Sequence, residues 1–302
     1  MKWYKLVFKQ NQPIHIGKFN WGVVSETEIF IPGQTIWGAI VNYYIMNEGI
    51  SSEDKLDKLK EALKNITNFF PSFNGINILE PVYNKYGEFA YKIKEEENEK
   101  LLTEDRFRLY FVDAEFKTSI DPFSLTAKEE KLYEFEYILP APKREFKEKI
   151  KEFNESLYWI GLLGQDNGLK DDKYLLKKGM KIYVGGDVRY GFGELELVHI
   201  TEVKGDELKR WHLDKKGNFI FQESTPLLNF VEFKNSIKFS GKLKLIVEMD
   251  FLQNEPVVMD AGYYIIPGSI IKNNKNSKNN SKYKLNKGKF KKDNKDNQQS
   301  AI

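Results

Sequence analysis

A glycine-rich segment near residue 190 contains residue types that contact phosphates and bases. Four glycines occur within nine residues, and glycine permits positive φ angles and a close approach of the backbone to a ligand. Consecutive backbone N–H groups in such a segment can point at phosphate oxygens. An arginine can pair with a phosphate or stack on a base, and aromatic rings provide further stacking faces. This combination suits single-stranded RNA, and the predicted contacts are Gly185, Gly186, Arg189, Tyr190, Gly191, Phe192 and Gly193.

The same segment does not match a nucleotide-cofactor motif. It has no Gly-Lys-Ser/Thr sequence, Gly191-x-Gly193 lacks a third glycine, and the residues that follow alternate as in a strand rather than a helix. We therefore predict no cofactor. A purely structural explanation stays open beside the RNA hypothesis, because glycines also form tight hairpins with β-bulges.

A second cluster follows the first predicted strand. His15 could take a proton from an RNA 2′-hydroxyl, and Lys18 could stabilise the developing charge. A single histidine between two isoleucines is more often packed and hydrogen-bonded in a core. We expect Lys18 to contact RNA and keep His15 only as the alternative catalytic residue. Glu26 and Glu28 share a strand face and are predicted to form a solvated edge.

Composition excludes several classes of protein. The 302 residues are 41% hydrophobic and 14% aromatic, which is typical of a globular chain. The absence of cysteine excludes disulfides and thiolate chemistry, and only three histidines argue against a histidine metal site. No apolar run is long enough to span a membrane, and the N-terminus lacks the pattern of a signal peptide. A cytoplasmic protein without membrane contact is predicted.

Charge is distributed unevenly along the chain. The formal net charge is +3, but residues 272–302 contain ten lysines and two aspartates, a surplus of +8 that leaves −5 on residues 1–271. The basic end is predicted to be either a solvated low-complexity tail or an arm that contacts RNA. Any RNA surface on the rest of the chain must be a local patch.

The hydrophobic pattern predicts an α+β protein. Alternation with period two predicts strands at residues 4–9, 27–31, 89–91, 107–111, 133–137, 181–184 and 195–197. Helical spacing predicts a helix capped by Thr35 and ended by Gly49, one with a capping box at Ser51 and Asp54, and one over residues 146–164. This order is that of a ferredoxin-like (RRM-like) unit with insertions, an antiparallel sheet with helices on one side. Trp37 should lie in the core of this unit.

A near-repeat bears on the domain organisation. Residues 28–36 and residues 263–271 are similar, because both place Ile-Pro-Gly after an extended segment. Only the first of these segments leads into a predicted helix. Chance similarity and a degenerate second copy are both open. We predict a first domain over residues 1–200, a β-rich C-terminal part over 201–271 and a disordered Asn/Lys-rich tail over 272–302.

Three motifs together resemble the RAMP superfamily of CRISPR-associated proteins. They are His15-Ile16-Gly17, the segment from Ile31-Pro32-Gly33 to Gly38-Ala39-Ile40, and Gly185-Gly186-x-x-Arg189-x-Gly191-Phe192-Gly193. The resemblance implies a RAMP fold, binding of CRISPR RNA through the glycine-rich loop, and assembly with other RAMP subunits and a polymerase-like large subunit. It is greatest to the type III subunits that hold the 5′ handle of the guide. RAMP subunits that cut target RNA typically carry an aspartate between the first two motifs, and residues 18–28 contain none.

These observations favour a non-catalytic subunit that binds guide RNA in antiviral defence. Two alternatives stay open. One is a metal-independent endoribonuclease that processes repeat RNA with His15 as the base. The other is a protein–protein adaptor that does not contact RNA.

Overall fold

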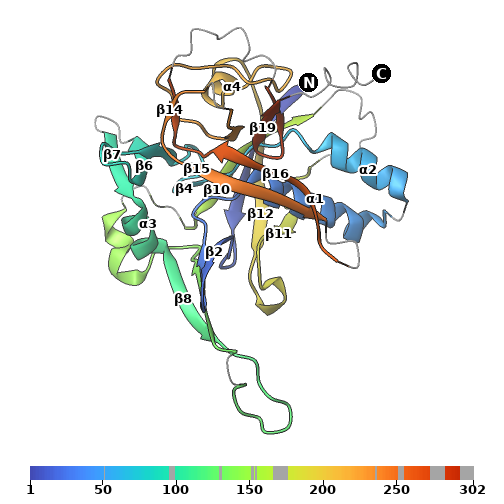
Figure 1. Ribbon diagram of the computed structural model, residues 1–302, viewed down its shortest axis with the longest axis vertical. Coiled ribbons are helices and arrows are strands. Elements are labelled where there is room, and N and C mark those ends of the chain that lie inside the picture. Colours follow the sequence, from blue (N-terminus) through green and yellow to red (C-terminus); the bar gives the residue numbers. More distant parts are fainter. Residues whose placement is uncertain are drawn as a thin grey trace.

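The chain folds into several mostly antiparallel sheets with few helices, as Figure 1 shows for the computed structural model. This confirms the α+β class. The structure describes residues 1–50, 52–94, 99–128, 131–150, 153, 155–165, 176–234, 237–250, 255–272 and 283–292. Its elements are β1 (Lys2–Gln10), β2 (Gly17–Trp21), β3 (Val24–Thr27), α1 (Gly33–Glu48), α2 (Glu53–Ala62), β4 (Phe70–Ser72), β5 (Glu80–Tyr83), β6 (Phe89–Lys94), β7 (Glu99–Thr103), α3 (Glu104–Phe111), β8 (Val112–Lys117), β9 (Tyr133–Ile138), η1 (Arg144–Lys149), β10 (Tyr158–Gln165), β11 (Lys181–Tyr183), η3 (Val188–Tyr190), β12 (Glu194–Val203), α4 (Asp206–Arg210), β13 (Phe230–Glu232), β14 (Phe239–Ser240), β15 (Leu243–Asp250), β16 (Val257–Ile265), β17 (Ile270–Ile271), β18 (Tyr283–Asn286) and β19 (Lys289–Lys292).

The central sheet has the strand order β11-β12-β1-β10-β4, and every neighbouring pair is antiparallel. The first strand lies in the middle of this sheet. The sequence indicated one buried face for β1, yet Leu6, Val7 and Phe8 are all buried, so both faces are covered. Because alternate side chains point to opposite faces of the sheet, β1 contributes to the core on both of its faces.

The prediction of a helix over residues 146–164 is wrong. Residues 144–149 form a short 3-10 helix, and residues 158–165 form β10, which pairs with β1 and β4. Spacing alone does not separate a helix from a strand that is buried on both faces, because such a strand is a continuous apolar run. Gly161 fits here because a Cβ at that position would meet the ring of Phe69.

Residues 107–111 form the C-terminal part of α3 rather than a strand. Phe107 and Phe111 are buried at helical spacing, whereas Leu109 is exposed. The Thr103 hydroxyl accepts a hydrogen bond from the Arg106 backbone N–H at 3.4 Å and so caps the helix. The apolar residues at positions 107, 109 and 111 resemble the alternation of a strand. Only Phe107 and Phe111 lie on the buried face of this helix, whereas Leu109 is exposed.

Helix α1 confirms its predicted C-terminal end but not its predicted cap. It begins at Gly33, after Pro32, and Thr35 does not cap it. The backbone N–H of Gly33 donates instead to the side-chain oxygen of Asn68 at 2.9 Å. Gly49 ends the helix in the left-handed conformation that glycine favours. Trp37 packs against the core but is only partly buried.

The prediction of a disordered tail is wrong for residues 283–292. These residues form the hairpin β18–β19, and β19 joins the second sheet, whose order is β15-β16-β13-β19-β18. Tyr283, Leu285 and Phe290 are buried in the core. The backbone of Gly288 approaches Gly33 so closely that a Cβ on Gly33 would lie 2.7 Å from the Gly288 nitrogen. Three apolar side chains spaced over eight residues were too weak a pattern within a lysine-rich segment.

The hairpin β8–β9 projects from the body of the molecule (Figure 1). Lys117 ends the outgoing strand, β8, and residues beyond it, such as Phe123 and Leu125, are strongly exposed. Among the described residues, no helix combines the length and apolar character that a membrane crossing needs.

Candidate nucleic-acid interface

The inner half of the glycine-rich loop packs against the segment that contains His15. Gly185 has φ of +78° and a Cβ there would collide with the carbonyl oxygen of His15. Gly193 has φ of +98°, and its N–H donates to the carbonyl oxygen of Pro13 at 2.8 Å. The N–H of Gly186 donates to the carbonyl oxygen of His15 at 3.0 Å. These contacts require glycine at two positions, and they leave the N–H groups of Gly186 and Gly193 occupied within the protein.

The outer half of the loop faces solvent. Residues 188–190 form the 3-10 turn η3, which Gly191 ends with φ of +87°. A Cβ at Gly191 would meet no atom within 4 Å. Tyr190 is 78% exposed and Arg189 is exposed as well. Within the described part of the chain, no acidic side chain pairs with Arg189, so its guanidinium is available to an anion.

Phe192 does not provide the open stacking face that the sequence suggested. It is buried, and its ring meets those of Phe135 at 5.6 Å and Tyr137 at 5.3 Å in edge-on geometry. Its role in this structure is to fix the loop to strand β9. Tyr190 is the aromatic residue of the loop that presents a face to solvent.

Lys117 is the site residue that sequence reasoning missed. From the outer end of strand β8, its ammonium group pairs with Asp187 of the loop and with Glu115 at 2.9 Å. It also lies over the rings of Phe135 at 4.1 Å and Phe192 at 4.7 Å. Partial desolvation opposes its charge, but the hydrogen bonds to Asp187 and Glu115 outweigh that effect and raise the pKa of Lys117. No sequence pattern connects position 117 with position 187.

His15 is a buried packing residue. It is 6% exposed and stacks on Phe135 with a centroid distance of 4.2 Å. Its Nδ1 lies 2.7 Å from the carbonyl oxygen of Glu136, which can only accept, so Nδ1 carries the proton. Nε2 is then the acceptor and lies 3.5 Å from the hydroxyl oxygen of Ser25. Burial lowers the pKa of His15, which keeps the ring neutral near pH 7.

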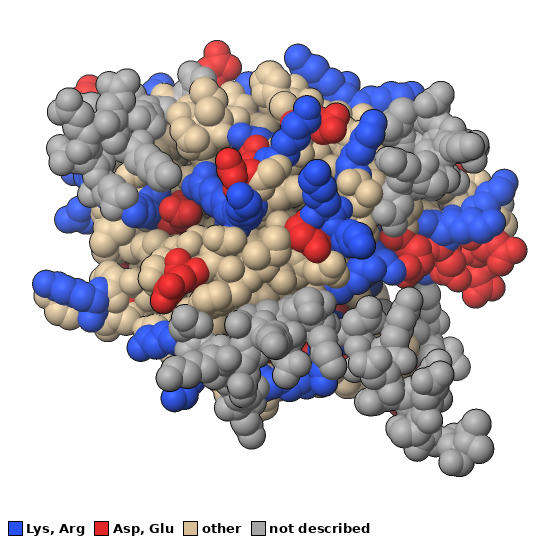
Figure 2. Space-filling view, turned by 90° about the horizontal axis from the view of Figure 1, so that it is seen from above, with Lys and Arg blue, Asp and Glu red and all other residues tan. Residues whose placement is uncertain are grey.

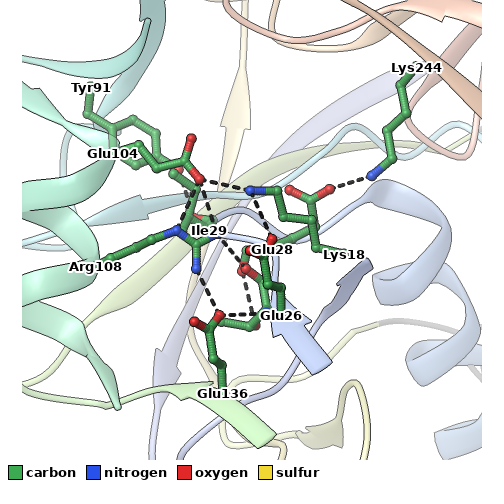
Figure 3. A network of polar contacts seen from close by, with 10 residues as sticks. Lys18, Glu26, Glu28, Ile29, Tyr91, Glu104, Arg108, Glu136 and Lys244 are labelled. Atoms are coloured by element: carbon green, nitrogen blue, oxygen red, sulfur yellow. Dashed lines mark hydrogen bonds and ion pairs between the residues drawn. The ribbon is translucent and has the colours of Figure 1, made fainter. Parts of the chain in front are cut away.

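Lys18 lies in a different polar network from the glycine loop (Figure 3). Its ammonium donates to Glu104 at 3.0 Å and pairs with Glu26 at 3.6 Å. Arg108 binds the same carboxylate of Glu104 and, at 3.0 Å, that of Glu136. Burial opposes ionisation of Glu104, but the charges of Lys18 and Arg108 prevail and lower its pKa. Lys18 is thus already paired with carboxylates, and its predicted contact with RNA would have to compete with them.

Glu28 is not part of a solvated edge. Its side chain is buried and forms an ion pair with Lys244 of β15, so the predicted exposure of this position is wrong. Figure 3 shows Lys244 reaching Glu28 from the opposite side to Glu104. The Glu28–Lys244 ion pair therefore connects the two parts of the chain.

The charged surface is mixed. Figure 2 shows lysine and arginine side chains interspersed with acidic ones over the face seen from above. This agrees with the slightly acidic balance of residues 1–271 and leaves RNA binding to local groups. No cluster of three or more His, Asp or Glu side chains suited to a metal ion occurs among the residues that the structure describes.

Comparisons with known proteins agree with this architecture. Among solved structures, a chain of the type III-B Cmr-beta complex bound to cognate target RNA and AMPPnP is 17% identical, with a TM-score of 0.52 over 89% of this chain and 86% of that chain. A chain of the Csm3-Csm4 subcomplex of the type III-A CRISPR-Cas interference complex is 15% identical, with a TM-score of 0.46 over 90% and 93%. No curated protein matches. At 17% identity, the likeness to the Cmr-beta chain concerns the fold alone.

A match to a family model assigns the class of protein. The model described as the RAMP superfamily matches residues 12–196, which is more than half of the chain and includes His15, Ile31-Pro32-Gly33 and the whole glycine-rich loop. The protein therefore belongs to the RAMP superfamily.

Proposed function

We propose that the protein is a non-catalytic subunit of a type III CRISPR effector complex that binds guide RNA in the cytoplasm. The observation that carries this proposal is the outer half of the glycine-rich loop. There Arg189 and Tyr190 are exposed side by side, on a loop that the contacts of Gly185 and Gly193 hold rigidly. An arginine without an acidic partner and an open aromatic face are the groups that single-stranded RNA requires.

Each loop residue has a separate role in this proposal. Arg189 pairs with a phosphate and Tyr190 stacks on a base. Gly191 lets the RNA backbone approach the loop, because the space beside it is open. Lys117 lies 5.8 Å from the centre of the Tyr190 ring and adds positive charge beneath it. Gly185, Gly186, Phe192 and Gly193 act indirectly, by holding the loop in place.

The order of the central strands supports the finer assignment of a ferredoxin-like fold. In chain order β1, β4, β10 and β12 are the first to fourth strands, and in the sheet they lie as fourth, first, third, second. We propose that β4 follows β1 through the helical crossover of such a unit, with β5 to β9 and α3 as insertions. We also propose that the second sheet, with its Ile-Pro-Gly turn at residues 266–268, is the degenerate second unit.

One further surface supports assembly with other RAMP subunits or with a polymerase-like large subunit. Strands β15 and β16 turn polar side chains toward the body, where Lys244 pairs with Glu28 and Lys289 with Glu248. Their outer face is apolar and exposed, and within the described residues β15 is the edge of its sheet. Exposed apolar faces of this kind mark protein contacts. The face includes Leu243, Leu245, Val247, Met249, Val258 and Tyr263.

The test of the main proposal is the affinity for labelled repeat RNA measured over a range of salt concentrations. Arg189→Ala should weaken binding and reduce the slope of log affinity against log salt by about one. Arg144→Ala is the matched control, because Arg144 is exposed on η1 and its loss changes the net charge equally. Equal affinities for Arg189→Ala and the unaltered chain would refute the assignment of the loop.

The alternative is a metal-independent endoribonuclease. The observation in its favour is that Nε2 of His15 is an acceptor beside the Ser25 hydroxyl, as a general base must be. Its low exposure argues against contact with RNA. Incubation with repeat RNA without metal distinguishes the two functions, because specific cutting that His15→Ala abolishes would replace the scaffold proposal.

A further inference from the structure

A second candidate site lies where the two parts of the chain meet. It is a cavity of about 280 Å³, close to the lower limit for small-ligand pockets and sufficient for one planar group. Its walls include β5 and β6 from the N-terminal part of the chain and β13 and β15 from the C-terminal part. The lining side chains that matter most are Phe30, Tyr83, Phe89, Phe230, Lys242 and Lys244.

Aromatic rings form a large part of the walls. Tyr83 and Phe89 are half-buried and meet at 5.8 Å with an interplanar angle of 83°, so they form a right-angled corner. Phe30 and Phe230 are nearly fully buried behind the surface. Burial and the nearby carboxylates of Glu104 and Glu28 raise the pKa of Tyr83, which keeps its hydroxyl protonated. A flat apolar ring inserted at this corner would have a stacking face on one side and a ring edge on the other.

Polar groups are placed around the same cavity. Lys18 and Glu104 lie at one side, and the Glu28–Lys244 ion pair lies at the other (Figure 3). A carboxylate accepts hydrogen bonds and an ammonium donates them, so a heterocycle that competes with these ion pairs finds both kinds of partner. Lys242 lies 5.7 Å from the centre of the Tyr83 ring, and in the described residues no carboxylate pairs with it. It is the free cation of this cavity.

We propose that this cavity binds one extruded base of a single-stranded RNA, stacked on Tyr83, with the adjoining phosphate on Lys242. An aromatic corner, hydrogen-bonding groups and an unpaired lysine at the rim are together the groups that bind the base and the phosphate of a nucleotide. The inference rests on the proposed function and adds a second contact to it. The same segment connects the two sites, because His15 contacts the glycine loop and Lys18, three residues later, lines the cavity.

Cross-linking tests where the base lies. A labelled single-stranded RNA of about twelve nucleotides that contains 4-thiouridine is irradiated with the full chain, and cross-linked peptides are identified by mass spectrometry. We expect cross-links in the peptide that contains Tyr190 and also in the one that contains Tyr83. Cross-links confined to the glycine loop would overturn this inference and leave the proposed function intact.

Affinity measurements with the same RNA test which groups bind it. Tyr83→Leu keeps an apolar side chain but removes the ring, and should weaken binding about tenfold, whereas Tyr83→Phe should bind normally. Lys242→Ala should reduce the salt slope by about one, unlike Lys238→Ala, which removes an exposed lysine outside the cavity. If a melting curve shows that Tyr83→Leu is unfolded, the salt slopes of Lys242→Ala and Lys238→Ala test the proposal instead.

The outcomes separate the two proposals. Weaker binding by Arg189→Ala with normal binding by Tyr83→Leu and Lys242→Ala would refute the cavity alone. That result would also be expected if a partner protein fills the cavity. Absence of RNA binding by the unaltered chain would refute both proposals.

Discussion

The two halves of the glycine-rich loop use the same residue types for different purposes. In the inner half, Gly185 and Gly193 are required because neighbouring backbone fills the space that a side chain would need. In the outer half, Gly191 has a similar positive φ but open space around it. An identical residue is thus a packing requirement at one position and a point of access at another. Substitutions in the two halves should therefore differ in their effects on stability and on RNA binding.

Gly185→Ala should have the largest effect. A methyl group would collide with the His15 carbonyl, and the positive φ adds backbone strain, so we expect a loss of about 3 kcal/mol or more in the free energy of unfolding. Chemical denaturation measures it. Gly191→Ala is the matched control, with an expected loss of about 1 kcal/mol from strain alone. Equal losses at the two positions would show that the halves do not differ.

Lys117→Ala should have the next largest effect. It leaves the partly buried carboxylate of Asp187 without its cation and removes contacts with two rings, at a cost of about 1–3 kcal/mol. Lys117→Met retains the packing and removes only the charge, so it separates the two contributions. RNA affinity should fall in both variants. Stability equal to that of the unaltered chain would mean that the hairpin does not support the loop.

Acidification should loosen the inner half. Burial holds the pKa of His15 below its unfolded value, so the associated stability is present above pH 6.5 and is lost as the pH falls through the folded pKa. Protonation would also place a cation near Lys117. Unfolding curves between pH 7.5 and pH 5 should therefore show decreasing stability, with a slope of at most about 1.4 kcal/mol per pH unit for each extra proton that the unfolded chain binds.

His212 contributes a slope of the same sign, since burial lowers its pKa too. His15→Phe should consequently reduce the pH dependence without abolishing it. A pH profile identical to that of the unaltered chain would mean that His15 does not titrate in this range.

Tyr190→Ala should have the smallest effect on stability, within about 0.5 kcal/mol, because its side chain is 78% exposed. Loss of one stacked base should nevertheless weaken RNA binding about tenfold, with little change in the salt slope because no charge is removed. Fluorescence anisotropy with labelled repeat RNA measures both quantities. A large loss of stability would mean that the Tyr190 side chain packs against the protein, as the inner half of the loop does.

Much of the architecture could be predicted from local patterns. Alternation identified β1, β11 and β12, and Gly49 identified the end of α1, because these signals arise from neighbouring residues. The patterns failed where a tertiary environment changed their meaning. The apolar run of β10 resembled a helix because it is covered on both faces, and the lysine-rich C-terminal end gained order by pairing with β13.

The candidate site shows the same division. The amino-acid sequence was enough to predict that residues 185–193 form a glycine-rich loop with an arginine and aromatic rings, and that the motifs resemble the RAMP superfamily. Only the tertiary structure decided that Arg189 and Tyr190 face solvent while Phe192 is buried, and that Lys117 lies beneath the loop. The physical reason is that conformational freedom belongs to each residue, whereas burial and charge pairing depend on groups that the fold brings together from distant parts of the chain.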